Sequence, residues 1–131
     1  MPQYSIRPAR VSDSEAIEEL LDLCGVGDPN VGTSTLVPTS LVATCDGVLI
    51  GFVHLIPGSP YAFITLLAVH PDHQKLGTAS ALLRVAVDSA MQAGATTVLG
   101  TVALDNHVVN DNLPGRGWEL VRPVNLWKKG K

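Results

Sequence analysis

The sequence predicts a single α+β (mixed α/β) domain over residues 1–131, with a central mixed, mostly antiparallel sheet flanked by helices. Three observations lead to this fold class. Three β-rich runs follow one another between Leu41 and Val69. Apolar residues recur with a helical period before and after these runs. A chain of 131 residues has the length of one domain.

The first expected elements are a strand and a helix. Tyr4–Arg7 is of strand type and is followed by Pro8. Ser12 and Glu15 have the spacing of a capping box, and apolar residues then recur every three or four positions up to Leu21. This pattern predicts an amphipathic helix that begins at Ser12.

A loop and three strands are expected next. Gly25–Ser40 is rich in Gly, Pro, Ser and Thr and has no period, which indicates a loop. The β-rich runs 41–45 and 48–55 flank Asp46-Gly47, a strong signal for a hairpin. Ala62–Val69 is almost entirely apolar, as expected for a strand that is covered on both faces.

The period then becomes helical from Gly77 to Ala93, and Gly94 is well placed to end that helix. Thr96–Leu104 is rich in Thr and Val and predicts a strand. The strand–helix–strand unit that results is expected to be a parallel crossover. The last expected elements are a short helix and two short strands, at His107–Leu113, Trp118–Val121 and Asn125–Trp127.

Composition and charge exclude several classes of protein. Hydrophobic residues make up 46% of the chain and charged residues only 16%, which excludes a disordered chain. The net charge of −3 argues against nucleic acid as a partner, because a polyanion needs a basic face. The sequence has no apolar run long enough for a membrane span, so no membrane partner is expected. Met1–Arg10 lacks the apolar stretch of a signal peptide, and Cys24 and Cys45 form no disulfide framework, so we expect a cytoplasmic protein.

The segment Leu67–Ala79 carries the clearest chemical pattern. A buried strand ends at His70-Pro71, and the small residues Gly77 and Thr78 open the next helix. Backbone N–H groups at a helix start have no intrahelical partner and lie at the positive end of the helix dipole, so the pattern suits a pyrophosphate. The spacings of the Walker loop and of the GxGxxG fingerprint are absent. An ordinary strand–loop–helix connection is the alternative.

Gln74-Lys75-Leu76-Gly77-Thr78-Ala79 resembles the Q/R-x-x-G-x-G/A motif of the GNAT superfamily of acetyl-CoA-dependent N-acetyltransferases. Leu67-Ala68-Val69-His70-Pro71 is similar to the strand that precedes this motif in the family. The resemblance extends over nearly the whole chain, through segments in the family's order: Ile6–Ala9, Val48–Phe52, and Asn106 followed by Gly117-Trp118.

The resemblance implies a GNAT-like acyl-CoA acyltransferase fold with acetyl-CoA, or CoA, as the cosubstrate. In that family the pantetheine arm inserts beside a strand as a pseudo-strand, and a loop at the start of the next helix holds the pyrophosphate. Carried over by motif, the cosubstrate would contact Leu67, Ala68, Val69, Gln74, Lys75, Leu76, Gly77, Thr78, Ala79 and Asn106.

Two positions depart from the family pattern. A Glu that acts as base in many members corresponds here to Thr65, which cannot act as a base at neutral pH. A Tyr that protonates the leaving thiolate corresponds here to Leu113. The resemblance therefore implies binding of CoA and leaves the catalytic acid and base unknown.

His54 and Tyr61 are the candidates for a catalytic role. The ordinary pKa of histidine suits a general base, but alternation places His54 on the face of Phe52, where a histidine with satisfied hydrogen bonds is the alternative. Tyr61 lies at the entrance of its strand, within reach of the expected cleft. His70 and His73 lack a zinc-type set of further ligands, so no metal is expected.

The function expected from these features is transfer of an acetyl group from acetyl-CoA to a primary amine, by direct attack in a ternary complex. A thioester is already activated, so positioning can supply much of the rate. The alternatives are an acyl-CoA-binding or regulatory module without catalysis, and a purely structural domain. The expected partner is a small-molecule or peptide amine, which the sequence does not identify, and a homodimer is left open.

Overall fold

The computed structural model describes residues 3–26, 36–101, 110–111, 113–122 and 129–130, without the side chains of residues 75 and 76. The chain falls into two compact units, Met1–Gly100 and Thr101–Lys131, and each is described by itself. That residues 1–131 act as a single domain stays a prediction.

The first unit is built on a five-stranded sheet in which, among the described residues, the strands lie side by side in chain order. β1–β4 pair antiparallel in succession, and β5 pairs parallel with β4. This arrangement confirms the predicted mixed, mostly antiparallel sheet and the parallel connection after β4. The strands are β1 (Tyr4–Pro8), β2 (Ser40–Cys45), β3 (Val48–Ile56), β4 (Tyr61–Val69) and β5 (Thr97–Gly100).

The turn between β2 and β3 is the predicted hairpin at Asp46-Gly47. Asp46 has a φ of 50° and Gly47 a φ of 82°. A two-residue turn with two positive φ angles matches the twist of the flanking strands, and Asp followed by Gly adopts it at low cost. The local sequence alone therefore specifies this connection.

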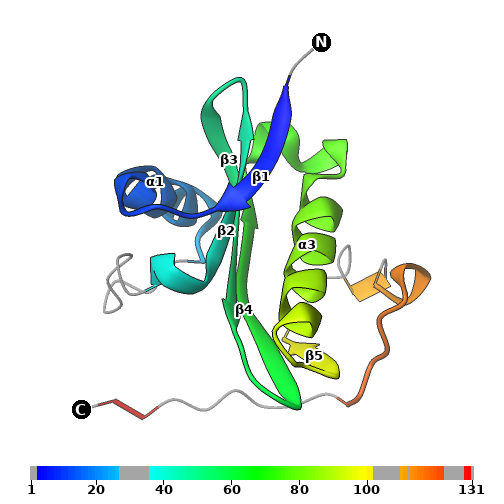
Figure 1. Ribbon diagram of the computed structural model, residues 1–131. Helices are drawn as coiled ribbons and strands as arrows, with labels where there is room; N and C mark the ends of the chain where they lie inside the picture. Colours follow the sequence, from blue (N-terminus) through cyan, green and yellow to red (C-terminus); the bar gives the residue numbers. More distant parts are fainter. Residues whose placement is uncertain (1–2, 27–35, 102–109, 112, 123–128, 131) are drawn as a thin grey trace. The chain divides into compact units, whose positions relative to one another are not determined.

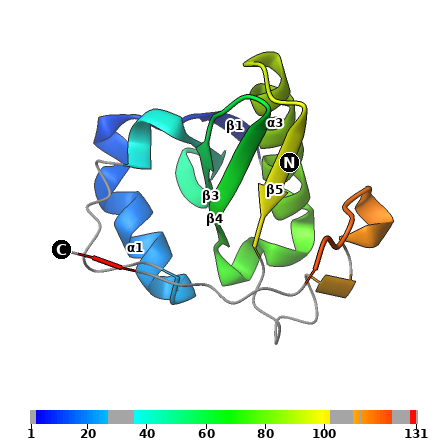
Figure 2. The same cartoon turned by 90° about the horizontal axis from the view of Figure 1, so that it is seen from below.

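Two helices, α1 (Ser14–Cys24) and α3 (Thr78–Gln92), lie against opposite faces of the sheet (Figures 1 and 2). Each presents an apolar stripe to its face. The cluster on the face of α1 consists of Ile17, Leu20, Leu21, Val37, Val42, Phe52 and Ala68. On the other face α3 buries Leu82, Ala86 and Ala90, and Gly51 of β3 lies directly beneath Leu82. Phe52 and Gly51 thus lie on opposite faces of β3, because successive residues of a strand point to opposite faces of the sheet.

Short 3-10 helices precede or follow these elements: η1 (Val11–Asp13), η2 (Val37–Thr39) and η3 (Pro71–Leu76). A further one, η4 (Pro114–Arg116), belongs to the second unit.

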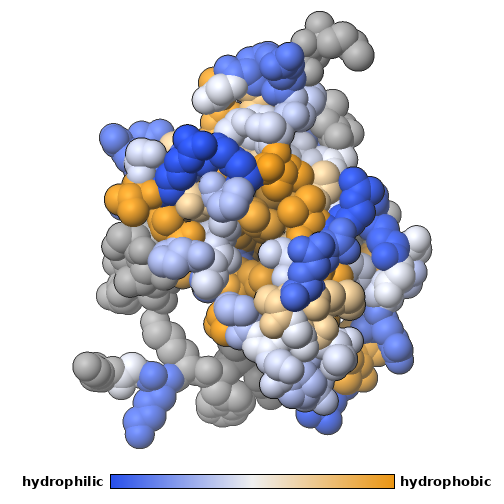
Figure 3. All heavy atoms as spheres, viewed as in Figure 1, coloured by the Kyte–Doolittle hydropathy of each residue, from blue (hydrophilic) through white to orange (hydrophobic). Residues whose placement is uncertain are grey.

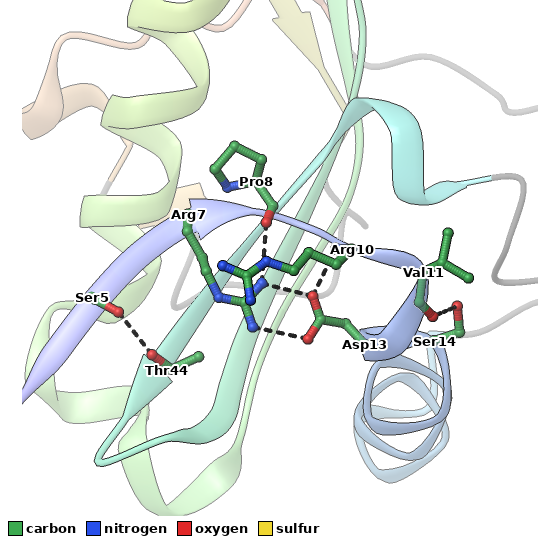
Figure 4. Close-up of polar contacts among 8 residues, drawn as sticks. All are labelled: Ser5, Arg7, Pro8, Arg10, Val11, Asp13, Ser14 and Thr44. Atoms are coloured by element: carbon green, nitrogen blue, oxygen red, sulfur yellow. Dashed lines mark hydrogen bonds and ion pairs between the residues drawn. The ribbon is translucent and has the colours of Figure 1, made fainter.

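The predicted start of α1 is wrong in detail. The helix begins at Ser14, after η1, and the capping box of Ser12 and Glu15 does not form. The Asp13 carboxylate instead accepts a hydrogen bond from the backbone N of Arg10 at 2.7 Å (Figure 4). It also accepts two from the guanidinium of Arg7 on β1, at 2.7 and 2.9 Å. An ion pair between β1 and the residue before α1 thus sets the entry to the helix, and the apolar period of the sequence does not reveal it.

The second unit is described only in part. The strand predicted at Trp118–Val121 is wrong, because residues 118–122 have no regular structure. Asn110 and Asp111 are helical, in agreement with the predicted short helix, whose residues 107–109 and 112 lie outside the described residues. The strand predicted at 125–127 also lies outside them. η4 ends at Arg116, and the chain turns at the next residue, Gly117, which has a φ of 87°.

The surface mixes hydrophilic and hydrophobic residues, and Figure 3 shows hydrophobic side chains between hydrophilic ones on the face in view. The exposed large apolar side chains of the first unit are spread over several elements and include Tyr4, Val11, Leu23, Val48 and Tyr61. Single residues of this kind are normal on a protein surface. Among the described residues, no helix has the length and apolar character needed to cross a membrane.

Candidate cosubstrate and acetyl-transfer site

The candidate site begins where β4 and β5 stop pairing. β5 lies beside the first part of β4 only (Figure 1), and the last pair joins Ile64 to Gly100. β4 continues to Val69, and within the described residues Thr65–Val69 has no strand partner on the side of β5. Backbone N–H and C=O groups at a strand edge form a template for an extended ligand.

Alternation of the peptide groups shows which residues of β4 face this edge. The backbone N of His70 donates to the carbonyl of Ile50 on β3, at 2.7 Å. Successive residues of a strand direct their peptide groups to opposite edges, so those of Val69 and Leu67 are directed away from β3. These are the two residues expected to bond the pantetheine arm. Ala68 has its side chain buried in the cluster beneath α1.

The carbonyl of Val69 is already held by two side chains. It accepts a hydrogen bond from Gln74 Nε2 at 3.1 Å and from Cys24 Sγ at 3.4 Å. Gln74 therefore ties the loop to the end of β4, and Cys24 ties the end of α1 to the same point. Burial raises the pKa of the Cys24 thiol, so the neutral donor form is favoured. Neither contact could be predicted from the pattern of the sequence.

The loop after β4 carries the expected pyrophosphate segment. η3 begins at Pro71, and the backbone N of Asp72 donates to His70 Nδ1 at 3.1 Å. Gly77 then adopts a left-handed conformation with a φ of 76°, and no atom lies within 4 Å of the position that a Cβ would take. α3 starts at Thr78, so its first amides follow this open position. Gly77 thus leaves room for an anion at the positive end of α3.

The other predicted cosubstrate residues are only partly described. Thr78 is buried and Ala79 half-buried in the first turn of α3, while the side chains of Lys75 and Leu76 are outside the description. Asn106 lies outside the described residues. Leu113 is half-buried in the second unit, where its carbonyl accepts hydrogen bonds from the backbone N of Arg116 and of Trp118.

His54 is buried and has a hydrogen-bond partner at each ring nitrogen. Nδ1 lies 2.5 Å from Thr65 Oγ1, and Nε2 lies 2.9 Å from Thr39 Oγ1. Burial lowers the pKa of His54, so the imidazole is neutral at neutral pH. Tyr61, the second catalytic candidate, is exposed at the start of β4, where it pairs with Thr97. The structure thus brings His54, and not Tyr61, into contact with Thr65, the first residue of β4 beyond its last pair with β5.

His70 and His73 lie in the loop, with ring centroids 5.7 Å apart. Among the described residues, no group of three or more His, Cys, Asp or Glu is arranged to hold a metal ion.

The sequence model of the acetyltransferase (GNAT) family matches residues 13–112. None of the curated proteins matches the sequence. Solved structures share the fold at low sequence identity. An aminoglycoside N-acetyltransferase in complex with CoA has a TM-score of 0.83 at 18% identity, and the match covers 98% of this chain and 96% of that one.

Two further neighbours have different acceptors in their names. Ribosomal-protein-alanine N-acetyltransferase from Brucella melitensis biovar Abortus 2308 has a TM-score of 0.74 at 17% identity, with coverage of 99% and 100%. Diaminobutyrate acetyltransferase from Paenibacillus lautus, in complex with its substrate L-2,4-diaminobutyric acid and coenzyme A, has a TM-score of 0.75 at 19% identity, with coverage of 88% of this chain and 75% of that one. The family model and the fold confirm the prediction from sequence: the chain belongs to the GNAT family of acetyltransferases, enzymes that use acetyl-CoA.

Proposed function

We propose that this protein transfers the acetyl group of acetyl-CoA to a primary amine by direct attack in a ternary complex. The observation that carries the proposal is the edge of β4 at Thr65–Val69, which continues beyond the last pair with β5. This edge leads into Gly77 and the start of α3. An extended arm along the edge and a pyrophosphate at Gly77 would use both features at once.

The residues present fit such a cosubstrate. The peptide groups of Leu67 and Val69 face the edge, and the open position at Gly77 admits a phosphate close to the backbone. When bound, acetyl-CoA supplies an activated thioester. The chain itself would align the amine with that thioester, and positioning of this kind can be worth about 7–11 kcal/mol of the barrier.

The acceptor is proposed only as a class, a primary amine on a small molecule or a peptide. The structural neighbours named above act on amines of very different size, so the shared fold supports the reaction type and not one acceptor. A panel that covers this range consists of neamine, L-2,4-diaminobutyric acid, spermidine and a peptide with an N-terminal alanine.

The alternative is a module that binds acyl-CoA and does not catalyse transfer. It is favoured by Thr65 and Leu113, which replace the ionisable side chains found at those positions in many members of the family. A homodimer also stays a possibility left open by the sequence.

Two measurements separate these functions. Calorimetric titration with CoA reports binding, and release of free CoA thiol with each amine of the panel reports transfer. The proposed enzyme binds CoA and releases thiol with at least one amine, faster than with water alone. Binding without amine-dependent release would favour the non-catalytic module, and absence of binding would contradict both.

A further inference from the structure

The hydrogen bonds of His54 connect Thr65, where β4 continues beyond its last pair with β5, to Thr39, which is exposed. Thr65 is the first residue of β4 beyond its last pair with β5. It is also the extra residue of a β-bulge, because His54 pairs with Leu66 while Leu55 pairs with Ile64. The bulge re-aims the side chain of Thr65, so that its hydroxyl meets His54 although the two residues are not paired across the strands.

The chain of groups continues through the imidazole. His54 Nε2 lies 2.9 Å from Thr39 Oγ1, and Thr39 is exposed at the end of η2. A hydroxyl can donate and accept at the same time, and a neutral imidazole donates at one nitrogen and accepts at the other. Thr65, His54 and Thr39 therefore form an unbroken path of groups that can each pass on a proton.

We propose that Thr65, His54 and Thr39 form a proton relay that removes the proton of the acceptor amine and delivers it to solvent. The inference rests on the proposed function. Thr65 is the residue that touches the amine, and His54 and Thr39 act through it.

The step balances without a further reactant. The amine nitrogen forms its bond to the acetyl carbon while the carbon–sulfur bond breaks, and the electron pair stays on sulfur as a thiolate. One proton of the amine passes to Thr65 Oγ1 as the proton of Thr65 passes to His54 Nδ1. The proton on His54 Nε2 passes to Thr39 Oγ1, whose own proton goes to solvent. The low pKa of a thiol lets the thiolate leave without a strong acid.

The surroundings of His54 keep it in the neutral form that the relay needs. β2, β4 and η2, which pack around it, contain no charged residue, and their titratable side chains, Cys45 and Tyr61, lie at far ends of β2 and β4. α1 covers the same face with apolar residues, and its carboxylates are exposed. Burial lowers the pKa of His54, so the ring is neutral at neutral pH.

The direct test compares three variants over a range of pH, with the best acceptor of the amine panel. Thr65→Val keeps the shape and removes the hydroxyl, Thr65→Ser restores a hydroxyl, and His54→Gln removes the titrating ring. Thr44→Val is the matched control, because Thr44 is a buried threonine of the same sheet, and its hydroxyl also has a side-chain hydrogen-bond partner, Ser5 Oγ at 2.8 Å.

General base assistance is typically worth about 10²–10⁴-fold. We expect Thr65→Val to lower kcat at pH 7 about 100-fold, with little change in the affinity for CoA. Thr65→Ser should stay within about 5-fold of the wild type. The deficit of Thr65→Val should shrink at high pH, because hydroxide in the solvent can then take the proton of the attacking amine in place of the relay. The double variant, Thr65→Val with His54→Gln, should have a kcat no lower than that of the slower single variant, because the two residues act in one relay.

The relay is overturned if Thr65→Val has the activity of Thr44→Val at every pH. It is also overturned if Thr65→Ser is as slow as Thr65→Val, or if the losses of the two single variants multiply. Should Thr65→Val fail to fold, His54→Gln carries the same comparison against Thr44→Val. A wild-type protein that binds CoA and acetylates no amine contradicts both the proposed function and the relay. An active wild type whose kcat does not change on Thr65→Val contradicts the relay alone.

Discussion

His54 on β3 and Thr65 on β4 are joined side chain to side chain, Nδ1 to Oγ1 at 2.5 Å, although the sheet register pairs His54 with Leu66. The contact exists because Thr65 is inserted as an extra residue in β4. The same insertion lies one residue beyond the point where β5 stops pairing. Bulges are common beside active sites because they re-aim a side chain, and this one directs the hydroxyl of Thr65 to a buried imidazole.

Replacement of Gly51 by alanine should destabilise the protein. A Cβ at Gly51 would lie 2.8 Å from Leu82 Cδ1 and 3.2 Å from the Cβ of Ala43, and Leu82 is fully buried. Overpacking of this kind typically costs about 1–3 kcal/mol. We expect a loss of that size in the free energy of unfolding, measured in urea. Gly100→Ala is the control, because the atoms nearest to its Cβ lie at 3.6 Å or more, an ordinary contact. Equal stability of the two variants would contradict the close approach of α3 to β3.

The ion pair of Asp13 predicts a dependence of stability on pH. Its hydrogen bonds with Arg7 lower the pKa of Asp13 from 3.8 to about 2 (Figure 4). The folded state therefore holds the proton more weakly than the unfolded state. The stabilisation is fully present well above pH 4 and is lost as the pH falls through about 2. Because the carboxylate is only 12% exposed, we expect it to be worth about 2 kcal/mol at pH 7.

Asp13→Asn should remove this contribution. In urea the difference from the wild type should be about 2 kcal/mol at pH 7 and should fall to about half of that at pH 3. Asp88→Asn, on the exposed side of α3, should have little effect at either pH. A difference that does not change between pH 7 and pH 3 would show that the ion pair is not its origin.

Much of the fold could be predicted from the sequence because local rules and the burial of apolar side chains specify it. Asp46-Gly47 determines a hairpin by its φ angles, and the apolar run of β4 requires cover on both faces. The start of α1 could not be predicted, because it depends on the ion pair between Arg7 on β1 and Asp13 just before α1, and neither the strand pattern nor the helix pattern includes both residues. The candidate site was predictable as a motif around Gly77. The contacts of Gln74 and Cys24 with Val69, and of Thr39 with His54, join segments that no periodicity connects.

Gln74→Glu should weaken the binding of CoA by about tenfold. The variant keeps the length of the side chain and replaces the donor that holds the Val69 carbonyl with a second acceptor. It also places a negative charge beside the expected pyrophosphate. Loss of one such hydrogen bond typically costs about 0.5–1.5 kcal/mol, and repulsion adds to it. The matched control is Gln92→Glu at the exposed end of α3. Calorimetric titration would contradict the role of Gln74 if both variants bound CoA as the wild type does.

Whether CoA binds at the start of α3 is tested most directly by calorimetric titration of CoA into the wild type, Gly77→Glu and Gly47→Glu. The two glycines have similar positive φ angles, 76° and 82°, and neither has an atom within 4 Å of the Cβ position, so the backbone strain of the two substitutions is comparable. Only Gly77 lies at the helix N-terminus assigned to the pyrophosphate. The account predicts that the wild type and Gly47→Glu bind CoA alike, while Gly77→Glu stays folded and loses at least about 100-fold in affinity. Binding of CoA by Gly77→Glu with unchanged affinity would contradict the site.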